Sequence, residues 1–169
     1  MWQIELCVQL KTYDLSALTA KQTLWEMGYK ELGDIFRKDC YIFNLSTETR
    51  KEAESIVKNL AEKTPLLVNP NKHRYYIRRQ KTEDKRQKEK VEVLVWYRED
   101  VRKKILLDSL KSFGYNLEDV LCGVLWQITV TADKEGSIAL VQKMTKELLM
   151  NPHSQDYKIF VTIYPSEVK

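Results

Sequence analysis

The sequence has few of the residues from which nucleotide-binding loops, metal sites and disulfide scaffolds are built. Its 169 residues include five glycines, three cysteines and two histidines. Neither a G-x-x-x-x-G-K-[ST] nor a G-x-G-x-x-G pattern occurs, which excludes the common Gly-rich phosphate loops. Cys7, Cys40 and Cys122 are isolated, odd in number and without a C-x-x-C spacing, which argues against a disulfide framework and structural zinc. We therefore expect buried or half-buried free thiols, no metal ion and no cofactor.

Long apolar runs are also missing. No stretch approaches the roughly 20 apolar residues that cross a bilayer as a helix. The first residues, MWQIELCVQLK, lack the basic-then-apolar order of a secretion signal. These two absences predict a cytoplasmic protein with no membrane association.

The positive charge is concentrated in one segment. The net charge is +4, and residues 78–90, RRQKTEDKRQKEK, contain seven basic and three acidic residues, a surplus of four. The remainder is balanced, so it lacks the net positive charge that is typical of nucleic-acid-binding proteins. We interpret residues 78–90 as a solvated charged linker, with a helical spacer as one form of it.

One pattern occurs twice in the chain. LLVNPNKHRYYIR begins at residue 66, and LLMNPHSQDYKIFV begins at residue 148, 82 positions later. Two further pairs keep the same order, IELCVQL with VEVLVWY at a spacing of 87 and LWEMGY with LKSFGY at a spacing of 86. Insertions of single residues in loops account for the change in spacing. The sequence therefore predicts a first repeat over residues 1–77, a charged linker over 78–90 and a second repeat over 91–169.

Each repeat is predicted to fold as β-α-β-α-β. Alternating apolar residues, such as Ile4, Leu6 and Val8, mark the strands. Gly28 and Gly114 predict left-handed ends for the first helix of each repeat, and the Asn-Pro pairs end the second helices. Apolar residues at helical spacing give one expected buried face for each helix: Ala20, Leu24 and Met27; Val57, Leu60 and Thr64; Leu106, Leu110 and Phe113; and Val141, Met144 and Leu148.

The fold class that follows is α+β. Each repeat is expected to be a two-layer sandwich of an antiparallel sheet and two helices. The second face of each sheet also carries apolar residues, more than open water favours, so we expect the repeats to pair as an intramolecular pseudo-dimer. The residues expected at this inter-repeat interface are Leu94, Trp96, Phe160, Tyr164 and Ile42.

Residues suited to catalysis are scarce. His73 and His153 both lie close to an Asn-Pro turn, and neither is accompanied by a nucleophile pattern. Four tryptophans and nine tyrosines are present, but no segment resembles the aromatic and basic signature of RRM domains. The residues alone predict a paired α+β scaffold without a catalytic site of its own.

The ordered motifs resemble the PurS family, the small subunits of phosphoribosylformylglycinamidine synthase in purine biosynthesis. Family members show a helix that ends near Gly-Tyr, a Gly-Lys at a strand entry and a closing LL-x-NP-x-x-E-x-Y pattern. The matching positions are Gly28-Tyr29, Leu66-Leu67, Asn69-Pro70 and Tyr75 in the first repeat, and Gly114-Tyr115, Gly123, Leu148-Leu149, Asn151-Pro152 and Tyr157 in the second. Two features depart from the pattern. His73 and Gln155 replace its acidic residue, and Lys38-Asp39 and Gly123-Val124 replace its Gly-Lys.

The resemblance implies a non-catalytic subunit of an amidotransferase and ligase complex. Such a subunit bridges the glutaminase subunit and the ATP-dependent synthetase subunit, between which ammonia passes. Further association into a homo-oligomer is open. The resemblance implies partner-binding residues in the two turns: Asn69, Pro70, Tyr75, Asn151, Pro152 and Tyr157.

Two other classes of function are open. One is a paired ACT-like regulatory domain that binds a small ligand between its copies. Its turns between first strand and helix contain glycine, whereas KTYDLSAL and YREDVRKK contain none. The other is a nucleic-acid-binding adaptor that uses the basic linker, and its binding would weaken as salt rises.

Overall fold

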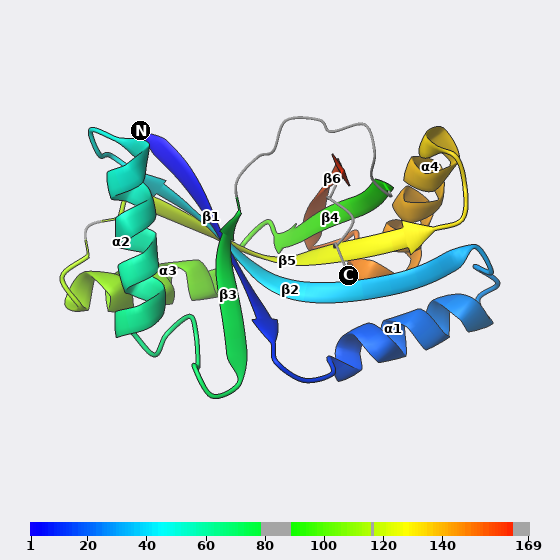
Figure 1. The fold of residues 1–169 in the computed structure, drawn as a ribbon, viewed down its shortest axis with the longest axis horizontal. Coiled ribbons are helices and arrows are strands. Elements are labelled where there is room, and N and C mark those ends of the chain that lie inside the picture. The colour runs from blue at the N-terminus through cyan, green and yellow to red at the C-terminus, as the bar shows by residue number, and fades with distance from the viewer. Residues whose placement is uncertain (79–88, 116, 164–169) are drawn as a thin grey trace, which may run out of the picture. The chain divides into compact units, whose positions relative to one another are not determined.

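The chain forms two successive β-α-β-α-β repeats, as the sequence predicts (Figure 1). A computed structural model describes residues 1–78, 89–115 and 117–163. The first repeat contains β1 (Trp2–Leu10), α1 (Leu15–Glu26), β2 (Leu32–Leu45), α2 (Arg50–Lys63) and β3 (His73–Arg78). The second contains β4 (Glu89–Tyr97), α3 (Val101–Ser112), β5 (Asp119–Val130), α4 (Lys134–Met144), the π-helical turn η1 (Thr145–Leu149) and β6 (Gln155–Ile163).

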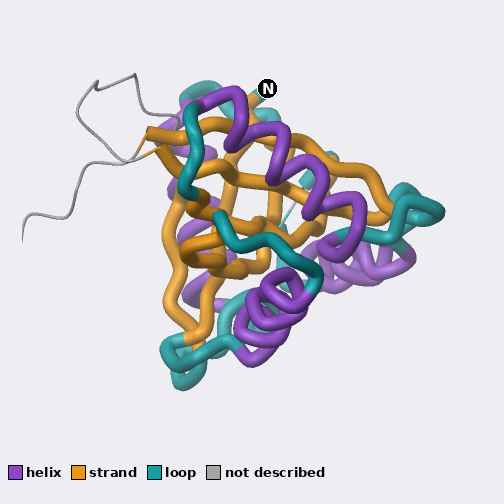
Figure 2. The backbone as a smooth tube through the Cα atoms, turned by 90° about the vertical axis from the view of Figure 1, so that its right-hand side faces the viewer, coloured by secondary structure: helices purple, strands orange, loops and turns teal. Residues whose placement is uncertain are grey.

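The strands have the order β3-β1-β2-β5-β4-β6 in an antiparallel sheet, which confirms the α+β class. In each repeat the first strand therefore lies between the other two. In the first repeat the register pairs Ile4 with Phe43 across β1 and β2, and Leu6 with Ile77 across β1 and β3. Figure 2 marks the helices, strands and loops along the backbone.

The Gly-Tyr motif ends the first helix of each repeat in the same way. Gly28 and Gly114 have φ angles of 102° and 86°, a left-handed conformation that residues with a Cβ rarely adopt. The following Tyr29 donates its N–H to the Leu24 carbonyl at 3.1 Å, and Tyr115 donates to the Leu110 carbonyl at 3.2 Å. These bonds are the outer closure of a Schellman motif, so the predicted helix stops are confirmed.

The second helix ends differently in the two repeats. Thr64 and Thr145 are both buried and both bond back to the carbonyl four residues earlier, at 2.7 Å. Pro65 follows Thr64 and cannot continue α2, whereas Lys146 follows Thr145 and allows the extra π-helical turn.

The π-helical turn corrects one predicted face. A wider turn shifts the face that its residues present, so Leu149 is buried and the expected Leu148 is only half-buried. Met27 and Phe113 were also expected to be buried, but they are 45% and 51% exposed. Both are C-cap residues, at which the chain leaves the helix.

The compact units of the fold do not coincide with the sequence repeats. Compact unit 1 consists of residues 1–12, 38–79 and 96–124, and compact unit 2 of residues 13–37, 80–95 and 125–169. Unit 1 therefore contains α2 and α3, one helix from each repeat, and unit 2 contains α1 and α4. The boundaries of the repeats themselves, and the linker at 78–90, stay predictions from the sequence; residues 79–88 lie outside the described residues.

The core of unit 1 is assembled from both repeats. Phe43 of β2 and Leu60 of α2, from the first repeat, are in the same buried cluster as Leu110 and Val120 of the second. All four side chains are fully buried. Further members of the cluster are Ile4, Leu6, Val8, Leu45, Ala53, Val57, Ala61, Leu67, Val68 and Leu117.

Unit 2 also contains buried residues of both repeats. Leu24 of α1 is fully buried, as are Val141 and Met144 of α4. Tyr29, just after α1, donates a hydrogen bond from its hydroxyl to the carboxylate of Glu147 in η1. Burial and this bond together raise the pKa of Tyr29 to about 12, so the hydroxyl stays protonated and donates at neutral pH.

One buried polar pair also lies in unit 2. Glu92 of β4 is fully buried, and it accepts a hydrogen bond of 2.5 Å from the side-chain amide of Gln127 in β5. A buried carboxylate requires such donors, because removing it from water is costly. Gln127 therefore helps to accommodate the polar side chain of Glu92 in the middle of the strand VEVLV.

Candidate functional site

The first Asn-Pro turn is held by its own asparagine. The side-chain oxygen of Asn69 accepts from the Asn71 N–H at 3.0 Å, and its carbonyl accepts from the His73 N–H at 2.7 Å. The Asn69 N–H in turn donates to Nδ1 of His73 at 3.1 Å. The proline between them fixes φ in the range that a turn requires. The turn thus connects α2 to β3 with Asn69 as its central hydrogen-bonding residue.

The second turn has the same geometry at the equivalent positions. The side-chain oxygen of Asn151 accepts from the His153 N–H at 3.0 Å, and its carbonyl accepts from the Gln155 N–H at 2.9 Å. The Asn151 N–H donates to Oε1 of Gln155 at 2.7 Å. The repeated motif therefore has a structural reason, because each copy uses it to join its second helix to its last strand.

The motif tyrosines join the same elements. The Tyr75 hydroxyl donates to Glu62 of α2 at 2.6 Å, and the Gln142 amide of α4 donates to the Tyr157 hydroxyl at 3.0 Å. Burial and the Glu62 contact raise the pKa of Tyr75 to about 12, so the hydroxyl is a donor at neutral pH. Both tyrosines are half-buried.

The surfaces of the two turns differ. In the first, Pro70, Asn71 and Lys72 are exposed, and in the second Pro152 and His153 are exposed. The first turn is also fixed to the end of β1, because Lys11 donates from Nζ to the Pro70 carbonyl at 2.5 Å and from its backbone N–H to the Lys72 carbonyl at 2.9 Å. One turn lies in each compact unit. A partner that binds one turn would therefore contact a different surface from a partner that binds the other.

The residues predicted at the inter-repeat interface differ in burial and in the compact unit to which they belong. Leu94 and Ile42 are buried, and Trp96 and Phe160 are half-buried. Ile42 and Trp96 belong to unit 1, and Leu94 and Phe160 belong to unit 2. Tyr164 lies outside the described residues. The assignment of these five residues to one interface stays a prediction.

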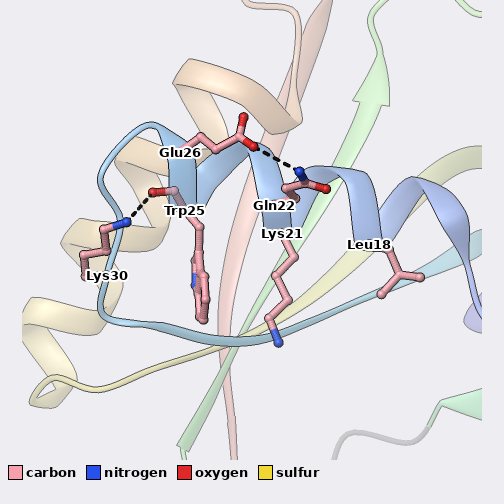
Figure 3. Close-up of a pocket in the computed structure, with 6 residues that line it drawn as sticks. All are labelled: Leu18, Lys21, Gln22, Trp25, Glu26 and Lys30. Carbon is pink, nitrogen blue, oxygen red and sulfur yellow. Dashed lines mark hydrogen bonds between the residues drawn. The ribbon is translucent and has the colours of Figure 1, made fainter.

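A surface that the repeat motifs did not indicate lies along α1, where the Lys21 and Trp25 side chains extend from the helix toward β2 (Figure 3). Trp25 is 48% exposed, and its indole N–H is fixed on the Leu32 carbonyl at 3.0 Å. Lys21 lies 5.9 Å from the centre of the Trp25 ring and forms an ion pair of 3.0 Å with Asp34. An open pocket of about 390 Å³ is lined by Leu18, Lys21, Gln22, Trp25, Glu26 and Lys30. In the sequence, this surface is indicated by apolar residues that lie on more than one face of the helical segment 15–26.

The cysteines are free, as expected. Cys7 and Cys40 are buried, and Cys122 is half-buried. Among the described residues, no group of His, Cys, Asp and Glu side chains is arranged to hold a metal ion. In the same part of the chain, no helix is long and apolar enough to cross a membrane.

The comparison with protein families is informative for both repeats. The family model of PurS, described as phosphoribosylformylglycinamidine (FGAM) synthase, matches residues 3–81 and again residues 90–162. The chain belongs to the PurS family. It is a tandem-duplicated member, because the two matches follow one another and cover most of the sequence. A comparison with curated proteins gives no match.

The turn geometry explains one departure from the PurS pattern. His73 and Gln155 stand where the pattern has an acidic residue, and each accepts the N–H of the turn asparagine. A neutral imidazole, an amide oxygen and a carboxylate can all accept at that point. Both repeats therefore have an acceptor at that point, although the residue types differ.

The other departure lies at a strand. Lys38 donates from Nζ to the Tyr76 hydroxyl at 2.9 Å and lies 5.0 Å from the centre of its ring. Gly123 lies within β5, which continues without a break to Val130. The lysine of the first repeat is thus engaged with β3 in unit 1, while the second repeat has no side chain at the equivalent position.

Replacing the acceptors tests this account of the turns. We expect His73→Ala and Gln155→Ala each to lower the free energy of unfolding by about 0.5–1.5 kcal/mol, the usual net value of one hydrogen bond. We expect Gln155→Glu and His73→Gln to remain within about 0.5 kcal/mol of the native chain, because an acceptor is retained. Urea unfolding followed by circular dichroism measures the difference. Equal losses for the alanine variants and their acceptor-retaining counterparts would show that the side-chain acceptor is unimportant.

Proposed function

We propose that this PurS-family chain is the non-catalytic bridging subunit of phosphoribosylformylglycinamidine synthase in the cytoplasm. It links the glutaminase subunit to the ATP-dependent synthetase subunit, so that ammonia released by one is used by the other. The observation that carries the proposal is the family match over both repeats. The family is involved in FGAM synthase, and a chain without an evident nucleophile pattern fits a structural role in that enzyme.

The duplication supports bridging on physical grounds. Linking two copies makes their association intramolecular, at an effective concentration of order mM for a short flexible linker. It also allows the copies to diverge. The turn residues have diverged, with the exposed Asn71 and Lys72 in one turn and the exposed His153 and half-buried Ser154 at the equivalent positions. We propose that each turn, with its Asn-Pro pair and Tyr75 or Tyr157, contacts a different partner subunit.

Co-purification from the native cells tests the bridging role. We expect the tagged chain to recover both the glutaminase and the synthetase subunit when glutamine and Mg-ADP are present. We also expect glutamine-dependent synthase activity to fall to background when the chain is omitted from the reconstituted enzyme, while ammonia-dependent activity of the synthetase subunit persists. Glutamine-dependent activity that is unchanged without the chain would exclude the role.

Exchanging the residues that differ between the two turns tests the turns themselves. In one variant Asn71 and Lys72 become His and Ser, and His153 and Ser154 become Asn and Lys. The residues that hold the turns are kept, so the fold should persist and its unfolding midpoint serves as the control. We expect recovery of at least one partner to fall about tenfold, which corresponds to roughly 1.4 kcal/mol. Unchanged recovery of both partners by this variant would exclude the turns but not the bridging role.

A further inference from the structure

Two of the three cysteines face each other across neighbouring strands of compact unit 1. Cys7 of β1 is the direct register partner of Cys40 in β2, and on its other side Cys7 is the partner of Tyr76 in β3. The two thiols belong to residues that are 33 positions apart in the chain (40 − 7). Their adjacency is therefore created by the fold and is not visible as a C-x-x-C pattern.

Both thiols lie on the face of the sheet opposite α2 and α3. Ile4, Leu6 and Val8 of β1 belong to the core cluster that includes α2 and α3. Side chains alternate between the two faces of a strand, so Cys7 points the other way. Phe43 and Leu45 of β2 also belong to the core cluster, so the even-numbered residues of β2 lie on the other face. Cys40 is one of them and therefore lies on the same face as Cys7. Both cysteines are buried, at 0% and 1% exposure, so a peroxide reaches them only when the strands open locally.

The backbone already has a separation that a disulfide accepts. Directly opposed residues in antiparallel strands have Cα atoms about 4.5–5.5 Å apart, inside the roughly 4.4–6.8 Å range of disulfides. Their Cβ atoms are typically about 4.5–5.5 Å apart, whereas a disulfide draws them to about 3.5–4.5 Å. A bond here thus needs only a small local adjustment, and the adjustment makes it easier to reduce than a relaxed structural disulfide.

The surroundings of the pair favour one reactive thiol. A hydrogen bond from the Cys40 thiol lowers the pKa of Cys7, and so do the Tyr76 hydroxyl and the positive charges of Arg78 and Lys38. The same hydrogen bond and burial raise the pKa of Cys40. The thiolate is the attacking form of cysteine, and these pKa directions favour Cys7 as the nucleophile and Cys40 as the resolving thiol. Burial raises the pKa of Cys122 to about 11, and this thiol has little thiolate at neutral pH.

We propose that Cys7 and Cys40 form a reversible disulfide when the chain meets a peroxide, so that β1 and β2 become covalently joined. The Cys7 thiolate attacks one oxygen of hydrogen peroxide, the O–O bond breaks, and hydroxide leaves, giving a sulfenic acid. The Cys40 sulfur then attacks the Cys7 sulfur, the S–O bond breaks, and water leaves. Two thiols lose two electrons in total, and the peroxide is reduced to two waters. A thiol such as glutathione reverses the bond by exchange.

Peptide mapping of the folded chain tests the proposal. The reduced protein is treated with hydrogen peroxide, quenched, denatured in N-ethylmaleimide and digested without reductant. We expect linked peptides that contain Cys7 and Cys40, with Cys122 alkylated, and we expect glutathione to restore both thiols. Cys122→Ser should give the same linked pair. Full alkylation of Cys7 and Cys40 after treatment, or a linkage to Cys122, would overturn the proposal.

The order of attack has its own measurement. In Cys40→Ser the sulfenic acid on Cys7 has no resolving thiol, so dimedone should label Cys7 strongly. In Cys7→Ser the labelling of Cys40 should be at least about tenfold weaker, as its raised pKa leaves less thiolate. Stronger labelling of Cys40 than of Cys7 would contradict the assignment of the nucleophile. Circular dichroism of both serine variants controls for folding, and the mapping of the native chain stands independently of them.

Discussion

Replacing Leu110 with alanine is expected to loosen α2 and β1, which belong to the other sequence repeat, more than α4 and β6 of its own repeat. Leu110 of α3 is fully buried in the core cluster of unit 1, with Leu6, Phe43 and Leu60 of the first repeat. Removing a buried leucine side chain costs about 2–5 kcal/mol, because apolar contacts are lost and a cavity remains. The free energy of unfolding should fall by that amount.

Hydrogen exchange shows where the loss is felt. We expect Leu110→Ala to speed exchange of amides in residues 50–63 of α2 and in β1, since local opening draws on the stability of the unit in which the cavity lies. Leu24→Ala is the matched variant. Leu24 occupies the equivalent position in α1 and is also fully buried, but it belongs to unit 2, so faster exchange is expected in α4. If each substitution affected only its own repeat, the repeats and not the compact units would be the cooperative parts.

Much of the local structure follows from short-range rules. The helix ends at Gly28 and Gly114 were predictable because a glycine directly after an apolar helical face fits a left-handed stop. The repeated order of strands and helices was predictable because alternation with period two and apolar spacing of three or four residues are read directly from sequence. The family resemblance rested on these same positions, and the family match confirms it.

The partner of each helix could not be predicted in the same way. Periodicity tells which face of α1 or α3 is buried, and Leu24 and Leu110 were named correctly for this reason. It does not tell which strands cover that face. Equivalent helices of the two repeats have equivalent apolar patterns. A helix that packs on its own repeat therefore has the same sequence signal as a helix that packs on the other repeat. The first repeat's α1 belongs to unit 2, and the second repeat's α3 belongs to unit 1. This placement is therefore visible only in the tertiary structure.

The candidate site was predictable in position but not in working detail. The Asn-Pro pairs drew attention because they occur twice, yet the roles of His73 and Gln155 depend on a bond that closes around the turn. Their common feature, an acceptor four residues after the asparagine, becomes meaningful only with the turn geometry known. The Cys7 and Cys40 pair was missed for a similar reason, since strand register brings them together.

Separating the repeats is expected to abolish the native fold of each. A chain of residues 1–77 retains Leu6, Phe43 and Leu60 but lacks Leu110 and Val120, which complete the same core. A chain of about 80 residues buries only slightly more than 60% of its unfolded surface even when complete, so it has little stability to lose. We expect residues 1–77 and 91–169, produced separately, to show no cooperative thermal transition as monomers.

Cutting the intact chain provides the matched control. A protease site placed between residues 79 and 88 breaks the covalent link while every core residue of both units is kept. We expect the two fragments to co-elute in gel filtration and to unfold cooperatively, with a midpoint that depends on protein concentration because association is no longer intramolecular. A homodimer of residues 1–77 would agree with this account, since one copy's α1 could occupy the place of α3 in the other. A folded, cooperative monomer of either repeat would contradict it, because a core drawn from both repeats cannot be complete in one.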